Sequence, residues 1–209
     1  MDKELKDLLI TVRALYSKYG IKSMTMNDVA RELGMSKKTL YQFVNNKDEL
    51  VSKVCDLIEI EKDLIFQEIK NKKLNAIQSL MDVNKLVTKI LKEHNPGIEY
   101  DLRKYHPKVY FKVKERNHKA MYNSVLENLK QGKKEGLYRS DMDEKLIATL
   151  YVSRINSIRD NELIMREEMQ KPDFTNQLIE YHIRGVANDK GLKEFDNCMK
   201  ILKTELNYK

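Results

Sequence analysis

The stretch that decides the fold runs from Val29 to Leu50 and reads VARELGMSKKTLYQFVNNKDEL. The chain has only seven glycines, and one of them, Gly34, stands between two segments with helical apolar spacing. Glycine suits the position after a helix, because it adopts the left-handed conformation without a Cβ penalty. Ser36 then offers an N-cap oxygen for the next helix. The stretch therefore predicts two short helices joined by a tight turn.

The flanking residues extend this pattern in both directions. Thr25 and Asp28 have the spacing of a capping box and predict the start of the first short helix. Asn46 and Glu49 repeat that spacing and predict the start of a long helix. Residues 5–19 carry apolar side chains three and four apart, as one helix face does. Two short helices between two longer ones outline a helix-turn-helix unit.

The rest of the chain predicts longer helices, separated by segments that contain Pro or Gly. They are expected at residues 75–91, 97–106, 108–131, 142–169, 174–187 and 192–206. The predicted fold is all-α, with a three-helix helix-turn-helix domain at residues 1–48 and a larger helical domain at residues 49–209.

In a helix-turn-helix unit the second short helix lies in the DNA major groove, with its first residues at base edges. The first turn of this helix carries Lys37, Lys38 and Thr39. Gln42 can hydrogen-bond an adenine edge, and Tyr41 can reach a phosphate through its hydroxyl. Lys47 lies in the first turn of the next helix, where a cation is unfavourable unless an anion such as phosphate is near.

The distribution of charge agrees with an anionic partner. The whole chain carries a formal charge of +7, and the segment from Arg13 to Lys47 holds seven basic but two acidic residues. Such a surface favours nucleic acid or a membrane surface. The alternative is an ordinary three-helix packing unit with solvated lysines.

Nine residues together carry a more specific signal than any one of them. They are Thr25, Ala30, Gly34, Ser36, Thr39, Tyr41, Phe43, Lys47 and Leu50. Residues 8–53 resemble the DNA-binding domain of the TetR family of bacterial transcriptional regulators. The resemblance implies DNA contacts by Thr25, Lys37, Lys38, Thr39, Tyr41, Gln42 and Lys47, and Ser36 opens the helix presented to the groove. Gln42 departs from the His or Tyr that relatives often carry, which leaves the base preference open.

The resemblance also implies that the larger domain binds a small-molecule inducer and forms a homodimer. Residues 146–158, LIATLYVSRINSI, are apolar on two ridges, which predicts one helix partner in the same subunit and one across a dimer axis. Gly185 lies inside the helix expected at 174–187, where glycine costs about 1 kcal/mol relative to alanine, and close helix approach would offset that cost. The candidate dimer residues are Leu146, Leu150, Tyr151, Leu178, His182 and Gly185. A purely intramolecular core is the alternative.

Aromatic residues with polar tips gather between residues 100 and 122. The candidate ligand-binding residues are Tyr100, Tyr105, His106, Tyr110 and Tyr122. Such side chains line apolar ligand pockets. They also fill helical cores, so the pattern leaves both interpretations open.

Other classes of protein lack support in the sequence. Cys55 and Cys198 fit no metal or redox spacing, which predicts reduced thiols in a cytoplasmic protein. The start of the chain does not resemble a signal peptide, and no run of about 18 apolar residues predicts a membrane helix. The histidines show no pairing typical of zinc ligands. Phosphate-binding and nucleophile motifs are absent, so we expect neither a cofactor nor an enzyme.

The sequence thus predicts a cytoplasmic, dimeric, ligand-responsive DNA-binding regulator, most often a repressor in this family, that reads a pseudo-palindromic operator. Its expected partners are double-stranded DNA, an inducer of unknown identity and a second copy of the chain, with no membrane. One alternative is a nucleoid or division protein that binds DNA without a ligand. Another is an enzyme with an accessory DNA-binding module.

Overall fold

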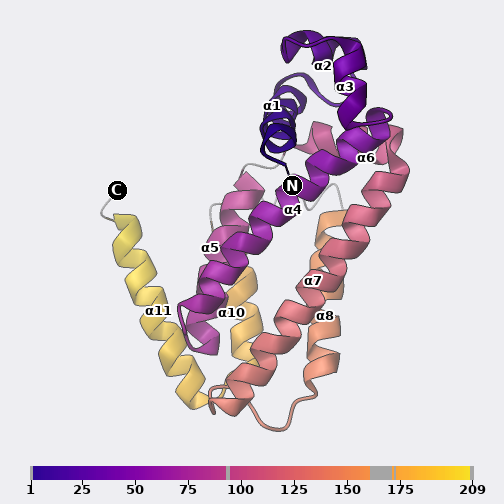
Figure 1. The fold of residues 1–209 in the computed structure, drawn as a ribbon. Helices are drawn as coiled ribbons and strands as arrows, with labels where there is room; N and C mark the ends of the chain where they lie inside the picture. Colours follow the sequence, from indigo (N-terminus) through magenta and orange to yellow (C-terminus); the bar gives the residue numbers. More distant parts are fainter. Residues whose placement is uncertain (1, 93–94, 161–170, 172, 208–209) are drawn as a thin grey trace. The chain divides into compact units, whose positions relative to one another are not determined.

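The computed structural model describes residues 2–92, 95–160, 171 and 173–207. Within these ranges the chain forms ten α-helices and no β-strand, which confirms the all-α prediction (Figure 1). The helices are α1 (Lys3–Tyr19), α2 (Met26–Glu32), α3 (Lys37–Phe43), α4 (Lys47–Asn71), α5 (Ala76–Lys92), α6 (Pro96–Tyr105), α7 (Pro107–Lys134), α8 (Glu144–Asp160), α10 (Phe174–Val186) and α11 (Asp189–Asn207).

Most helix ends lie within about three residues of the predicted ones, and two differences are informative. The helix predicted at 142–169 is observed as α8, from Glu144 to Asp160, and residues 161–169 lie outside the described residues. His94, one of the histidines considered as zinc ligands, also lies outside them. Gly132 was expected to end a helix, but α7 continues through it to Lys134. A Cβ at Gly132 would meet the Tyr138 ring at 2.1 Å, so this glycine provides room for a buried aromatic side chain.

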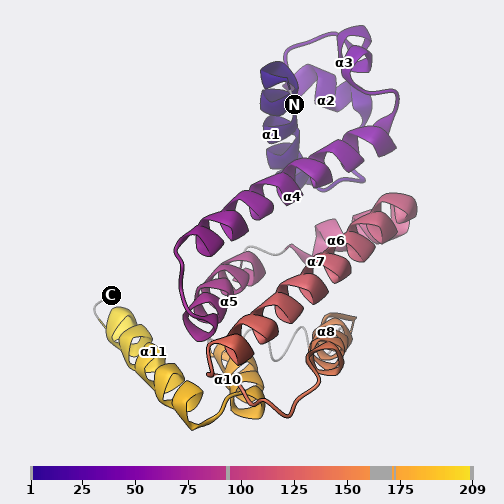
Figure 2. The same ribbon diagram turned by 60° about the horizontal axis from the view of Figure 1, so that its bottom comes forward.

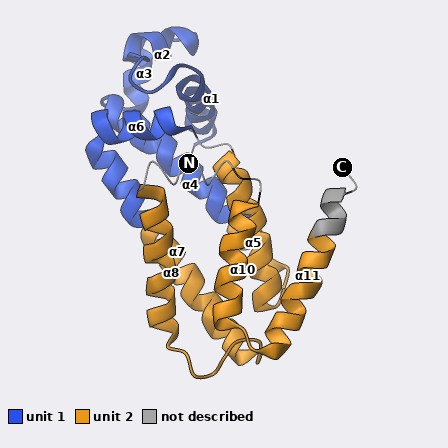
Figure 3. Cartoon of the chain, turned by 180° about the vertical axis from the view of Figure 1, so that it is seen from behind, with its two compact units in different colours: residues 1–65, 94–117 blue, residues 66–93, 118–209 orange. Residues whose placement is uncertain are grey.

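The chain divides into two compact units (Figure 3). Unit 1 comprises residues 1–65 and 94–117, and unit 2 comprises residues 66–93 and 118–209. The helices α4 and α7 each contribute to both units, without a break at the boundary. Unit 1 extends beyond the predicted DNA-binding domain at residues 1–48, because it also includes α6 and the first part of α7. The domain boundary at residue 48 stays a prediction.

The core of unit 1 brings the three N-terminal helices onto α4. Leu9 and Val12 of α1, Leu40 of α3 and Leu50 of α4 are fully buried in one cluster. Leu102 of α6 also belongs to this cluster. The short helices α2 and α3 are thus fixed by side chains from both long helices.

The core of unit 2 is built around α10, which packs against α5 and α11 (Figure 2). Ile183 of α10 and Phe195 of α11 are fully buried there. The segment after α7 is tied to the α10–α11 connection by an isolated bridge between Tyr138 and Ala187. The Asn188 N–H donates to the Leu137 carbonyl at 3.1 Å, which holds the start of α11 against this segment.

None of the helices in the described residues combines the length and apolar character that crossing a bilayer requires.

The two cysteines, Cys55 and Cys198, are free and half-buried. Burial raises the pKa of the Cys55 thiol to about 11.

Candidate DNA-binding site

The first short helix, α2, begins at a complete capping box, as predicted. The Thr25 hydroxyl accepts from the Asp28 N–H at 3.2 Å, and the Asp28 carboxylate accepts from the Thr25 N–H at 3.1 Å. The same carboxylate accepts the Thr25 hydroxyl proton at 2.6 Å, so this exposed hydroxyl is already engaged within the chain. The hydrogen bonds from Thr25 lower the pKa of Asp28, which keeps the capping carboxylate ionised.

The turn between α2 and α3 is a Schellman motif built on Gly34. Gly34 has φ +66°, the left-handed conformation expected from the sequence. Its N–H donates to the Arg31 carbonyl and the Met35 N–H donates to the Ala30 carbonyl, both at 3.0 Å. The last carbonyls of α2 are thereby satisfied, and the direction of the chain into α3 is fixed.

The second short helix, α3, begins at Ser36, whose side-chain oxygen accepts from the Thr39 N–H at 3.0 Å. The two hydroxyls of Ser36 and Thr39 also share a hydrogen bond of 2.8 Å. This pair holds the first turn of α3 in place. The turn exposes Lys37 and Lys38 and leaves Thr39 half-buried.

The two faces of α3 differ sharply. Leu40 is completely buried and Phe43 is half-buried against the core of unit 1. Gln42 is exposed on the other face, and Tyr41 is 40% exposed, with the Lys37 ammonium 5.9 Å from its ring centroid. Except for the half-buried Thr39 and Lys47, the residues predicted to contact DNA are exposed, and a DNA contact by each of the eight stays a prediction.

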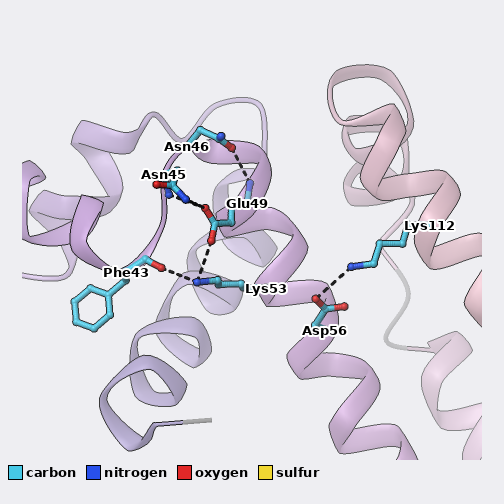
Figure 4. A network of polar contacts seen from close by, with 7 residues as sticks. All are labelled: Phe43, Asn45, Asn46, Glu49, Lys53, Asp56 and Lys112. Carbon is cyan, nitrogen blue, oxygen red and sulfur yellow. Dashed lines mark hydrogen bonds and ion pairs between the residues drawn. The ribbon is translucent and has the colours of Figure 1, made fainter.

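A polar network joins the end of α3 to the start of α4 (Figure 4). Asn46 caps α4 as predicted, with its side-chain oxygen accepting from the Glu49 N–H at 2.9 Å. The Glu49 carboxylate accepts from the Asn45 N–H at 2.7 Å, so it binds the residue before the expected one. Lys53 pairs with Glu49 at 3.1 Å and donates to the Phe43 carbonyl at 2.6 Å.

Lys53 is a structural contributor that the sequence did not reveal. A cation at the C-terminus of a helix is favoured by the helix dipole. Lys53 places its ammonium on the last carbonyl of α3, from one turn and a half into α4. The only local signal was the four-residue spacing of Glu49 and Lys53, which does not indicate a contact with α3.

Replacing Lys53 with methionine is expected to lower the free energy of unfolding by about 1–2 kcal/mol. The methionine leaves the Phe43 carbonyl without its donor and Glu49 without its cation. Urea unfolding followed by circular dichroism measures the change. Lys62→Met is the matched control on the same helix, because Lys62 pairs only with Glu59 three residues away among the contacts described. Equal effects of the two substitutions would show that the contact with α3 contributes nothing.

Lys47 is held more closely than the sequence suggested. Its ammonium donates to the Lys22 carbonyl at 3.3 Å, and partial burial lowers its pKa. The Lys22 N–H in turn donates to Asp101 of α6 at 2.8 Å. The turn between α1 and α2 is therefore bound by both α4 and α6.

A second link joins α4 to the helices that follow α5. His106, at the junction of α6 and α7, is buried and lies 2.5 Å from the Asp48 carboxylate. Asp56 accepts from Arg116 of α7 at 2.6 Å. It also pairs with Lys112 at 3.7 Å (Figure 4). All three contacts lie inside unit 1.

The five candidate ligand-binding residues are divided between the two units. Tyr100, Tyr105, His106 and Tyr110 belong to unit 1, whereas Tyr122 packs against the core of unit 2. Tyr100 is 46% exposed, and its hydroxyl accepts from Lys104 at 2.8 Å. A ligand role for these residues stays a prediction.

The candidate dimer residues divide into two groups. Tyr151 and His182 pack against each other within the chain, with ring centroids 4.5 Å apart, and Leu178 is half-buried. Burial and the nearby Arg154 lower the pKa of His182 to about 4, so its ring is neutral at pH 7. In contrast, Leu146 and Leu150 are more than half exposed, and Gly185 is exposed. A dimer contact by either group stays a prediction.

Over the ranges given above, no three side chains of His, Cys, Asp or Glu are grouped to hold a metal ion.

Comparisons with known proteins agree with the geometry of the α2–α3 unit. Residues 9–54 match the model of a family described as bacterial regulatory proteins, tetR family. The helix-turn-helix (HTH-type) transcriptional regulator YvaF of Bacillus subtilis (strain 168) is 26% identical over 169 residues, which cover 80% of this chain and 88% of that protein.

Two solved structures share the fold. A transcriptional regulator from Cytophaga hutchinsonii ATCC 33406 has a TM-score of 0.74 at 16% identity and covers 90% of this chain and 100% of its own. AibR, solved in complex with isovaleryl coenzyme A and operator DNA, has a TM-score of 0.54 at 15% identity, with 87% of this chain and 96% of its own covered. At such identities these matches concern the fold alone.

Proposed function

We propose that this chain, which belongs to the TetR family of bacterial transcriptional regulators, is a ligand-responsive repressor that binds a pseudo-palindromic operator as a homodimer. The observation that carries the proposal is the two-faced α3, with Leu40 completely buried and Lys37, Lys38 and Gln42 exposed. A packing helix has no need of such an exposed basic turn. A recognition helix requires it, because its first turn meets base edges and phosphates.

The residues divide by the kind of DNA contact they can make. Lys38 and Gln42 are the candidates for base edges in the major groove, since an amide can pair with adenine and an ammonium with guanine. Lys37, Tyr41 and Lys47 are candidates for phosphates, which position the protein without reading sequence. The remaining candidates, Thr25, Ser36 and Thr39, lie at the starts of the two short helices, and their hydroxyls are candidates for phosphates.

Responsiveness to a ligand is supported by analogy with AibR, which was solved with isovaleryl coenzyme A and operator DNA together. A ligand reduces DNA binding when it favours a dimer whose recognition helices no longer match the half-site spacing of ~34 Å. A difference in affinity of a few kcal/mol between the two dimer states is enough.

Selection of the purified protein against random duplex oligonucleotides, followed by sequencing of the bound pool, tests the proposal. An enriched inverted repeat is the expected result, and its release by small molecules then identifies inducers. A pool no different from the input would contradict sequence-specific binding. An enriched repeat that no compound releases would instead support a constitutive DNA-binding protein.

The dimer is expected to form through the exposed apolar side chains of α8. Leu150→Glu places a charge on this face and is expected to shift the protein from dimer to monomer in sedimentation velocity. The matched control is Ile201→Glu on α11, where another exposed apolar side chain receives the same charge. A Leu150→Glu protein that sediments as the unchanged dimer would move the interface away from this helix.

A further inference from the structure

Four side chains of unit 1 form a basic aromatic cluster, here called the Lys–Tyr cluster: Lys22, Tyr100, Lys104 and Tyr105. Lys22 lies in the turn between α1 and α2, and the other three lie on α6. The Lys22 ammonium is 4.9 Å and the Lys104 ammonium 5.6 Å from the centroid of the Tyr105 ring. Lys104 also donates to the Tyr100 hydroxyl at 2.8 Å. Two cations thus converge on one tyrosine ring.

The cluster holds more basic than acidic groups. Asp101 is the carboxylate beside Lys22 and Tyr105, and one of its oxygens accepts the Lys22 backbone N–H. One carboxylate therefore stands against the two ammonium groups of Lys22 and Lys104. The hydrogen bond from Lys22 and the positive field of both lysines lower the pKa of the Tyr105 hydroxyl. Neutral tyrosines hold the two ammonium groups in place without neutralising them, which leaves a surface suited to an anion.

The cluster adjoins the residue expected at a DNA phosphate. Lys47 donates to the carbonyl of Lys22, so its ammonium reaches the same turn from α4. Thr25, which opens α2, lies three residues after Lys22. Exposed charges act on one another over about 10 Å at 0.1 M salt. A phosphate near Lys47 therefore lies within the field of the cluster.

We propose that the Lys–Tyr cluster is a second phosphate-binding surface for duplex DNA, through which α6 extends the footprint of the helix-turn-helix unit. Its ammonium and phenol groups donate to phosphodiester oxygens and read no bases. The inference rests on the proposed DNA-binding function and adds to it two tyrosines that the sequence assigned to a ligand pocket.

The test compares three double variants with the wild-type chain, each binding a labelled random-sequence duplex over a range of NaCl concentrations. Lys22→Gln with Lys104→Gln removes both charges of the cluster. Lys22→Arg with Lys104→Arg keeps them. Lys119→Gln with Lys145→Gln removes two exposed charges from unit 2 and serves as the matched control. Thermal unfolding of every variant checks that the fold is retained.

The expected result is a salt dependence, log K against log[NaCl], that is shallower by roughly 2 per subunit in the glutamine pair of the cluster. The arginine pair and the unit 2 control keep the wild-type slope. If Lys22→Gln with Lys104→Gln keeps the wild-type slope, the inference is overturned and the helix-turn-helix proposal stays intact. The same holds if the unit 2 control reduces the slope by the same amount. A cluster pair that loses binding to anionic lipid vesicles but keeps the DNA slope also overturns it. A wild-type chain that binds no duplex overturns both proposals.

Discussion

Gly191→Ala is expected to lower the free energy of unfolding by about 3 kcal/mol. A Cβ at this position would lie 2.1 Å from the Leu137 carbonyl oxygen and 3.0 Å from the Ala187 Cβ. The obstacle is backbone and cannot rotate away as a long side chain does. Because the same carbonyl accepts the Asn188 N–H, a shift that relieves the clash also breaks the contact that seats α11.

The matched control is Gly185→Ala in α10. There a Cβ would meet no atom within 4 Å in the same chain, so alanine adds helix propensity without a clash. Its free energy of unfolding is expected to be unchanged or higher by up to about 1 kcal/mol. Urea unfolding of both variants measures the difference, and a Gly191→Ala protein as stable as the control would show that α11 does not need this close approach.

Lys38→Ala and Gln42→Ala are each expected to weaken binding to the selected operator by about 1 to 3 kcal/mol, or roughly 5- to 150-fold. Neither side chain contributes to the core, since both are exposed, so thermal stability is expected to be unchanged. Where the side chain reads a base, the loss of affinity is confined to operators that carry that base. The variant protein then binds operators with any base at that position equally well.

Lys47→Ala is the comparison that separates base reading from phosphate binding. It is expected to weaken operator and scrambled duplex alike and to reduce the salt dependence of binding by about 1. Fluorescence anisotropy with both duplexes measures the two effects. If Lys38→Ala and Gln42→Ala weaken both duplexes equally, α3 does not read sequence, and if neither weakens binding, α3 does not lie in the groove.

The parts of the site that the sequence predicted are those built from near neighbours. The capping box of Thr25 and Asp28, the turn at Gly34 and the cap at Ser36 each connect residues within about five positions. Such contacts depend on backbone geometry that a few residue types strongly prefer. Asn46 illustrates the limit, because it caps α4 as expected while the Glu49 carboxylate binds Asn45 instead.

The contacts that the sequence did not reveal join distant segments. Lys22 and Asp101 are 79 positions apart, and His106 and Asp48 are 58 apart. No periodicity or spacing encodes which side chain of a helix meets another helix, since that depends on packing of the whole unit. Gly132 shows the same difficulty, because a glycine that ends a helix and one that makes room for Tyr138 are identical in sequence.

The lengths of α2 and α3 have a consequence for how this protein is exposed to proteases. Each has seven residues, well below the length at which an isolated helix persists in water. Their caps and the shared burial of Val29 and Leu40 hold them together, so neither survives the loss of the other. Opening of this segment is therefore cooperative, as in a single foldon. Cleavage or misfolding of α3 is therefore expected to unfold α2 as well. A population of the protein then contains chains in which both short helices are folded and chains in which neither is.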